Sequence, residues 1–191
     1  GGTVMVKDIY PGSTSAYPAN LTPVGNTLYF SSTNDTNGTE LWKSDGTSVG
    51  TEMVRDIFPG GGSSAPAYFV SLGSTLYFRA NDGSKGSELW KSDGTAGGTV
   101  MVKDVYFGGG SSSPTNLTLA GDTVYFSAND GTNGRELWKS DGTSGGTVLV
   151  KDVRPNFDSS SPTYLTLIGS TLFFRAQDAE GYELWKVDIG Q

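Results

Sequence analysis

The side chains of this sequence that could carry chemistry are carboxylates, arginines and tyrosines, because its 191 residues include no histidine and no cysteine. Histidine is the commonest general base and metal ligand, and cysteine is the usual thiolate nucleophile. An enzyme built from this chain would therefore need a pair of carboxylates or a metal held by carboxylates. The acidic residues recur in repeated turns and at repeated strand ends, which indicates structural roles. We therefore predict no catalytic residue and no enzyme, with a carboxylate-based glycosidase as the last alternative.

A set of polar and aromatic residues alternates between equivalent positions along the chain. Asn and Tyr alternate two residues after four equivalent prolines, and Ser and Arg alternate in the strand that follows. A demand for packing alone would not require this alternation. The residues of this set that we take as candidate ligand-binding residues are Tyr68, Tyr164, Arg79, Arg175, Asn20 and Asn116. The alternative is plain ancestry, with each arginine paired to a nearby carboxylate such as Glu40 or Glu136.

Loops rich in Asn, Asp and Gly are candidates for a cation site. The run Asn129-Asp130-Gly131-Thr132-Asn133 offers oxygen ligands of the kind that Ca²⁺ prefers, although its spacing differs from that of an EF-hand loop. The candidate metal ligands are Asp130, Asn133 and Asp82. The sequence thus leaves open a structural Ca²⁺ ion, or an ion on the axis of a ring.

The elements that position these residues come from a fourfold repeat. The stretch Glu136-Leu-Trp-Lys-Ser-Asp-Gly-Thr143 recurs from Glu40 and Glu88, and in altered form from Glu183. The four tryptophans stand about 48 residues apart, which is typical of a repeat architecture. We expect these tryptophans to be core residues. The repeated Asp-Gly-Thr predicts a turn in which the carboxylate accepts a backbone hydrogen bond.

Each repeat contains four short runs of β-branched and apolar residues, separated by turns of Gly, Asn, Asp and Ser. Units of four strands at this period are typical of propeller blades. We predict one all-β domain over residues 1–191, a four-bladed β-propeller with four antiparallel strands per blade. The blades cover about 17–57, 65–105, 113–153 and 161–191, and residues 1–9 complete the last. Strand Thr3–Ile9 is expected to pair with Glu183–Val187 and close the ring.

The repeat resembles a known family. Glu-Leu-Trp-Lys-Ser-Asp-Gly-Thr followed by Gly-Thr-x-x-Val-Lys-Asp is similar to the ELWxxDGT repeat of large secreted or surface-attached bacterial proteins, over essentially the whole chain. The resemblance implies an extracellular bacterial module with a propeller-like fold. It brings no established activity, and the fourth copy departs from it at Val187-Asp188-Ile189.

Composition and resemblance together suggest partners. A net charge of −7 with 13 basic residues argues against nucleic acid, and no apolar run reaches the ~18 residues of a membrane helix. We predict a non-enzymatic extracellular or cell-surface module for binding or adhesion, with a glycan, a surface protein or another protein as ligand. The alternative is a structural subunit or spacer that self-assembles into a surface layer or fibre, so homo-assembly stays open.

Overall fold

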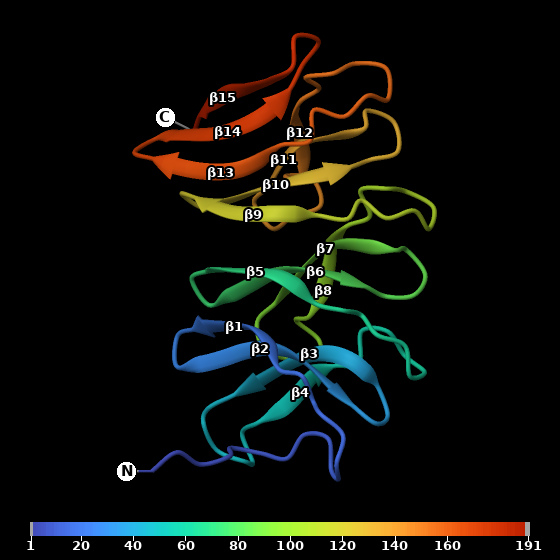
Figure 1. The fold of residues 1–191 in the computed structure, drawn as a ribbon, viewed down its shortest axis with the longest axis vertical. Coiled ribbons are helices and arrows are strands. Elements are labelled where there is room, and N and C mark those ends of the chain that lie inside the picture. The colour runs from blue at the N-terminus through green and yellow to red at the C-terminus, as the bar shows by residue number, and fades with distance from the viewer. Residues whose placement is uncertain (1, 190–191) are drawn as a thin grey trace. The chain divides into compact units, whose positions relative to one another are not determined.

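The computed structural model describes residues 2–189, which form 15 β-strands and no helix (Figure 1). Gly1, Gly190 and Gln191, which belong to the predicted domain, lie outside the described residues. No helix of residues 2–189 is therefore long and apolar enough to cross a bilayer. The prediction of an all-β chain is confirmed.

The strands form four antiparallel sheets that follow the repeats, and neighbours in the chain are neighbours in the sheet. The first sheet contains β1 (Ala19–Val24), β2 (Thr27–Asn34), β3 (Gly38–Ser44) and β4 (Glu52–Arg55). The second contains β5 (Ala67–Leu72), β6 (Thr75–Asn81), β7 (Ser87–Ser92) and β8 (Val100–Lys103). The third contains β9 (Thr115–Ala120), β10 (Thr123–Asn129), β11 (Arg135–Ser140) and β12 (Val148–Lys151). The last contains β13 (Thr163–Ile168), β14 (Thr171–Gln177) and β15 (Tyr182–Asp188).

Tight turns set the register of the first hairpin in each sheet. Val24 pairs with Thr27 across the turn between β1 and β2. Gly25 in this turn has a φ of +58°, a left-handed conformation that glycine adopts without a Cβ penalty. A Cβ at Gly25 would meet no atom within 4 Å, so the backbone conformation and not crowding favours glycine.

The contacts within the chain divide it into two compact units, residues 1–84 with 91–100, and residues 85–90 with 101–191. The first unit holds β1 to β6, and the second holds β9 to β15. Strands β7 and β8 contribute residues to both units. The first unit therefore contains the first sheet and strands of the second, and the second unit contains the third sheet and the last.

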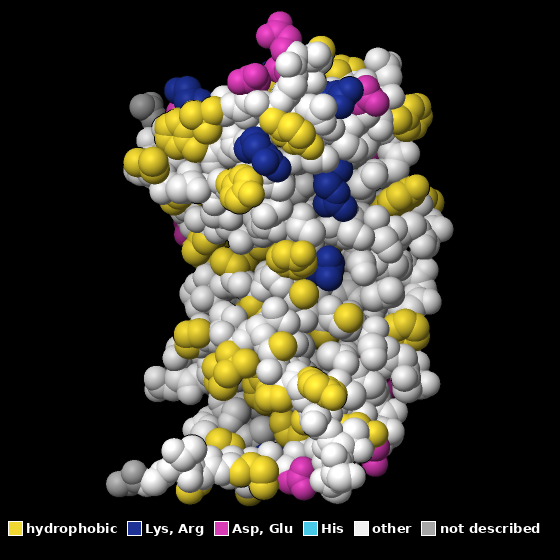
Figure 2. Space-filling view, in the orientation of Figure 1, with side chains coloured by type: hydrophobic (Ala, Val, Ile, Leu, Met, Phe, Trp, Pro, Cys, Tyr) yellow, Lys and Arg dark blue, Asp and Glu magenta, His cyan; other side chains and the backbone are white. Residues whose placement is uncertain are grey.

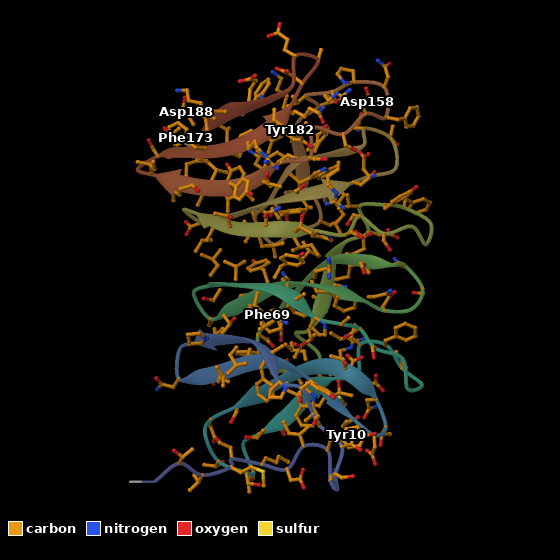
Figure 3. The ribbon with its side chains drawn as sticks, viewed as in Figure 1. Tyr10, Phe69, Asp158, Phe173, Tyr182 and Asp188 are labelled. Atoms are coloured by element: carbon orange, nitrogen blue, oxygen red, sulfur yellow. The ribbon has the colours of Figure 1, made fainter. Side chains whose placement is uncertain are left out.

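The core of each unit consists of the repeated apolar residues. In the second unit Tyr125, Leu137, Leu172 and Phe174 form one buried cluster, against which Trp185 packs in part. In the first unit Phe69 contacts Phe78 edge to face, with ring centroids 5.7 Å apart (Figure 3).

The repeated tryptophans are core residues in three of the four repeats. Trp42, Trp90 and Trp138 are buried, and Trp185 is half-buried. The alternation of side chains along a strand places apolar residues on both faces of a sheet. The prediction that the tryptophans serve packing is confirmed for the first three.

The N-terminal residues do not form the strand that the sequence predicts. Residues 2–10 contain no strand, and the last sheet has three strands and not four. The strand expected over Thr3–Ile9 is therefore not formed, and its pairing with β15 stays a prediction. The segment contacts the first sheet through side chains and not through a backbone ladder: Lys7 Nζ donates to the carbonyl oxygen of Thr51 at 2.7 Å, and Val6 and Ile9 line an apolar pocket against the first sheet.

Candidate functional site

The second sheet brings together one arginine and one tyrosine of the alternating set. Tyr68 lies on β5 and Arg79 on β6, where Arg79 pairs with Ala67. The guanidinium carbon of Arg79 is 4.8 Å from the centroid of the Tyr68 ring. This distance is within the ~6 Å of a cation–π contact.

The last sheet repeats this contact and adds a second ring. The guanidinium carbon of Arg175, on β14, lies 5.0 Å from the ring centroid of Tyr164 on β13 and 4.6 Å from that of Tyr182 on β15. Tyr182 opens β15 beside β14 (Figure 3). Sequence reasoning missed Tyr182, because the other repeats carry Thr39, Ser87 and Arg135 at its position.

Basic and hydrophobic side chains also lie next to one another on the face over β13 and β14 (Figure 2). All three residues of the contact in the last sheet are exposed. We call Tyr164, Arg175 and Tyr182 the arginine–tyrosine cluster.

A left-handed backbone position carries the alternating Asn and Tyr. The φ angles are 56° at Asn20, 59° at Tyr68, 55° at Asn116 and 57° at Tyr164. Each lies at the register shift between the first two strands of its sheet. Asn tolerates this conformation because its short amide can bond locally, whereas for Tyr it is strained. Strained positions of this kind cluster at functional sites, which keeps the two tyrosines as candidates.

The two asparagines of the set hold the chain together. Asn20 Nδ2 donates to Ser31 Oγ at 3.0 Å and to the carbonyl oxygen of Pro66 at 3.2 Å. Asn116 Nδ2 donates to the carbonyl oxygen of Pro162 at 3.4 Å. These bonds join neighbouring repeats within each unit. Their amides therefore have a structural role, which the sequence alone could not separate from ligand binding.

The carboxylates expected near the arginines lie elsewhere. Glu40, Glu88 and Glu136 are fully buried, and we call them the junction carboxylates. Glu88 accepts hydrogen bonds from the backbone N–H of Val105 at 3.0 Å and of Ser112 at 2.8 Å, and from Ser112 Oγ at 2.6 Å. Glu40 and Glu136 accept equivalent bonds in their own repeats. The alternative that Glu40 or Glu136 pairs with Arg79 or Arg175 is wrong.

Burial raises the pKa of all three junction carboxylates, because removal from water disfavours the charged form. The hydrogen bonds from the serine hydroxyl and from the backbone N–H groups act in the opposite direction. Nearby Asp104 and Asp152 raise the pKa of Glu88 and Glu136 further. The motif glutamate therefore tethers the loop that follows its own sheet.

The proposed cation ligands form turns of their own. Asp130 Oδ1 accepts from the N–H groups of Thr132 at 2.8 Å and Asn133 at 2.7 Å, and its Oδ2 accepts from Asn133 Nδ2 at 2.7 Å. Asp82 Oδ1 accepts from the N–H of Ser84 at 2.8 Å. No group of three or more His, Cys, Asp or Glu that could hold a metal occurs among residues 2–189. A Ca²⁺ ion at these turns stays a prediction.

The Asp-Gly-Thr turns have the predicted chemistry. Asp45 Oδ1 accepts from the N–H of Thr47 at 2.8 Å, and Asp93 Oδ1 from that of Thr95 at 2.9 Å. Hydrogen bonds from the threonine hydroxyl and N–H lower the pKa of both exposed carboxyls. These aspartates are therefore turn residues.

Comparison with solved structures identifies the fold. A puromycin hydrolase variant in complex with PGG aligns over 90% of this chain with a TM-score of 0.59 and 18% identity, and puromycin hydrolase itself gives 0.58 and 19%. A protein assigned as TolB from Agrobacterium tumefaciens aligns over 91% with a TM-score of 0.52 and 14% identity. The chain spans 26% of the hydrolase and 62% of the TolB chain. No protein-family model and no curated protein sequence matches the chain.

These likenesses establish a propeller-like fold with four sheets, and at such low identity they establish no activity. They also correct the functional prediction. The prediction of a module for binding and adhesion, with a self-assembling subunit as its alternative, is wrong, because the similar structures described above are a hydrolase and a TolB protein. Neither supports adhesion.

Proposed function

We propose that this chain is the non-catalytic, propeller-type framework of a hydrolase, with the catalytic groups supplied outside these 191 residues. The junction carboxylates carry the proposal. Acid–base catalysis needs a carboxyl group that reaches the substrate. Glu40, Glu88 and Glu136 are buried, and their oxygens accept bonds from the chain's own loops. The carboxyl groups whose pKa is raised therefore stabilise the fold by binding loops of the chain itself.

The fold comparison supports the choice of a hydrolase. The chain aligns with about a quarter of puromycin hydrolase, so that enzyme combines a framework of this kind with further structure. Within each unit, buried hydrogen bonds to the junction carboxylates fix the loops that lead to the next repeat, which suits a framework role.

The purified chain tests this proposal directly. Assayed with aminoacyl anilides and aryl esters, it is expected to show no turnover above the buffer blank. Glu136→Gln is expected to give the same result, with Glu180→Gln, an exposed carboxyl, as its control. Saturable hydrolysis that Glu136→Gln abolishes while circular dichroism shows a folded chain would overturn the proposal.

We also propose that the four sheets close as a four-bladed ring through the N-terminal segment. Basic side chains of the fourth-strand segments bond a threonine carbonyl oxygen of the next repeat in the same way. The three bonds are Lys7 Nζ to Thr51 at 2.7 Å, Arg55 NH1 to Thr99 at 2.7 Å, and Lys103 Nζ to Thr147 at 2.8 Å. Residues 2–10 therefore contact the first sheet as β4 and β8 contact the sheets that follow them. In the proposed ring, residues 2–10 are the fourth strand of the last sheet.

Strand β15 has the complementary deficit. It is a third strand without a fourth, and Leu184 on it is 76% exposed, whereas the equivalent Leu137 is 2% exposed. Val4 is 80% exposed. A free strand edge beside exposed apolar residues is unfavourable. Pairing of residues 2–10 with β15 would give the free edge of β15 a partner and would cover the exposed apolar side chains.

Cysteine pairs test closure cleanly because the chain has no cysteine of its own. Lys139 pairs with Val148 in the third sheet, so closure places Lys186 opposite Val4. The Val4→Cys, Lys186→Cys variant is expected to form a disulfide within one chain under mild oxidation. Val4→Cys with Lys139→Cys is the control and is expected to stay reduced. Bridges only between chains, or none, would contradict closure.

A further inference from the structure

The arginine–tyrosine cluster has a guanidinium whose hydrogen-bonding edge is unused. Within residues 2–189, the guanidinium of Arg175 contacts two tyrosine rings and makes no hydrogen bond and no ion pair within 4.0 Å. A guanidinium carries five N–H donors in a planar fork. Two tyrosine rings hold it in place, and its donors are left for another molecule or for water.

The cluster lies on three different strands of one sheet. Tyr164 is 70% exposed and Tyr182 is 53% exposed, so both rings reach the surface. The backbone of Tyr164 has a φ of 57°, a left-handed conformation that is unfavourable for tyrosine. Each cation–π contact at an exposed site contributes to holding the guanidinium in one orientation before a ligand arrives. The Arg175 guanidinium is therefore held between two tyrosine rings, with its N–H donors oriented before a ligand binds.

We propose that this cluster binds a carboxylate carried on an apolar or aromatic group. A carboxylate presents two coplanar oxygens that match the guanidinium fork. The tyrosine rings flank the fork and can pack against the apolar group. Phosphate sites gather several donors or charges, whereas this cluster contains one cation on a chain of net charge −7. A singly charged anion is thus the better match.

The chain contains a natural comparison site. Arg79 contacts one ring, that of Tyr68, because Ser87 stands where the last sheet has Tyr182. Arg79 is also less exposed than Arg175. With one flanking ring instead of two, this second site is expected to bind the same carboxylate more weakly.

Titration with phenylacetate, followed by NMR of the arginine Nε–H and tyrosine ring signals, tests the proposal. Saturable shifts are expected at Arg175, Tyr164 and Tyr182, with weaker shifts at Arg79. Arg175→Gln is expected to weaken binding by about tenfold or more, and Arg175→Lys by severalfold, because an ammonium lacks the fork. Tyr182→Ala should weaken binding at Arg175 alone. Arg154→Gln, which changes an arginine paired with Asp158, is the control and should leave binding unchanged.

Two further probes separate charge recognition from aromatic stacking and from general anion binding. Phenylacetamide lacks the charge and is expected not to bind, and inorganic phosphate is expected to bind about tenfold more weakly than phenylacetate, or weaker still. Equal binding of the amide would show aromatic stacking without charge recognition and would overturn the proposal. Equal binding of phosphate, or unchanged binding in Arg175→Gln, would also overturn it. Arg175 is exposed, so its variants are expected to fold, and a thermal melt checks this.

Discussion

Among single residues, the junction carboxylates each bind the loop that follows their own sheet. Glu88 accepts three hydrogen bonds from a loop that lies 17 to 24 residues further along the chain. Glu88→Gln replaces one acceptor oxygen by an NH₂ group, which leaves a buried donor without a partner. We expect this to lower the free energy of unfolding by about 1–3 kcal/mol in urea melts. The exposed Glu180→Gln is the control, and equal effects of the two changes would refute the role of Glu88.

The raised pKa of Glu88 predicts a pH dependence with a definite sign. Its folded-state pKa lies above the unfolded value of about 4.3. The stability that this group contributes is therefore fully present below that unfolded value and is lost as pH rises through the folded-state pKa. We expect the difference in unfolding free energy between the wild type and Glu88→Gln to shrink as pH rises above about 4.3. Urea melts from about pH 4 to about pH 8 measure it, and a difference that grows with pH would contradict the assignment.

Among the strands, the third of each repeat depends on a neighbour that covers its leucine. Leu137→Ala on β11 is expected to cost about 2–5 kcal/mol, because Leu137 is buried in the core of the second unit. Leu184 on β15 is exposed unless the ring closes. With closure, Leu184→Ala should cost an amount similar to Leu137→Ala. An effect on unfolding free energy close to zero would show that β15 stays uncovered and would refute closure.

At the scale of the whole molecule, residues 1–10 of the proposed ring contact both the first sheet and the outer edge of β15. Removal of residues 1–10 would uncover the apolar pocket on the first sheet that Val6 and Ile9 line, and would leave the outer edge of β15 without a partner strand. We expect the truncated chain to lose most of the ~5–15 kcal/mol of stability that is usual for a domain. Melting within a few degrees of the full chain would contradict ring closure.

The strands, the turns and most of the core could be predicted from the amino-acid sequence. Alternating residues fix which faces of a strand are apolar, and Asp45 bonds a residue only two positions away, so these features depend on local chemistry. The repetition of Trp42, Trp90 and Trp138 indicates the core, and the structure buries all three.

The roles of the glutamates, the arginines and the N-terminal segment could be read only from the folded chain. Glu136 bonds Ser160, and Tyr182 contacts Arg175, only because the chain brings the partners together in space. A residue that is repeated for packing looks the same in sequence as one that is repeated for binding. Residues 2–10 have the pattern of a strand, yet a strand needs a paired edge, and the sequence could not tell which surface they contact. That choice depends on the packing of whole sheets and not on the local pattern.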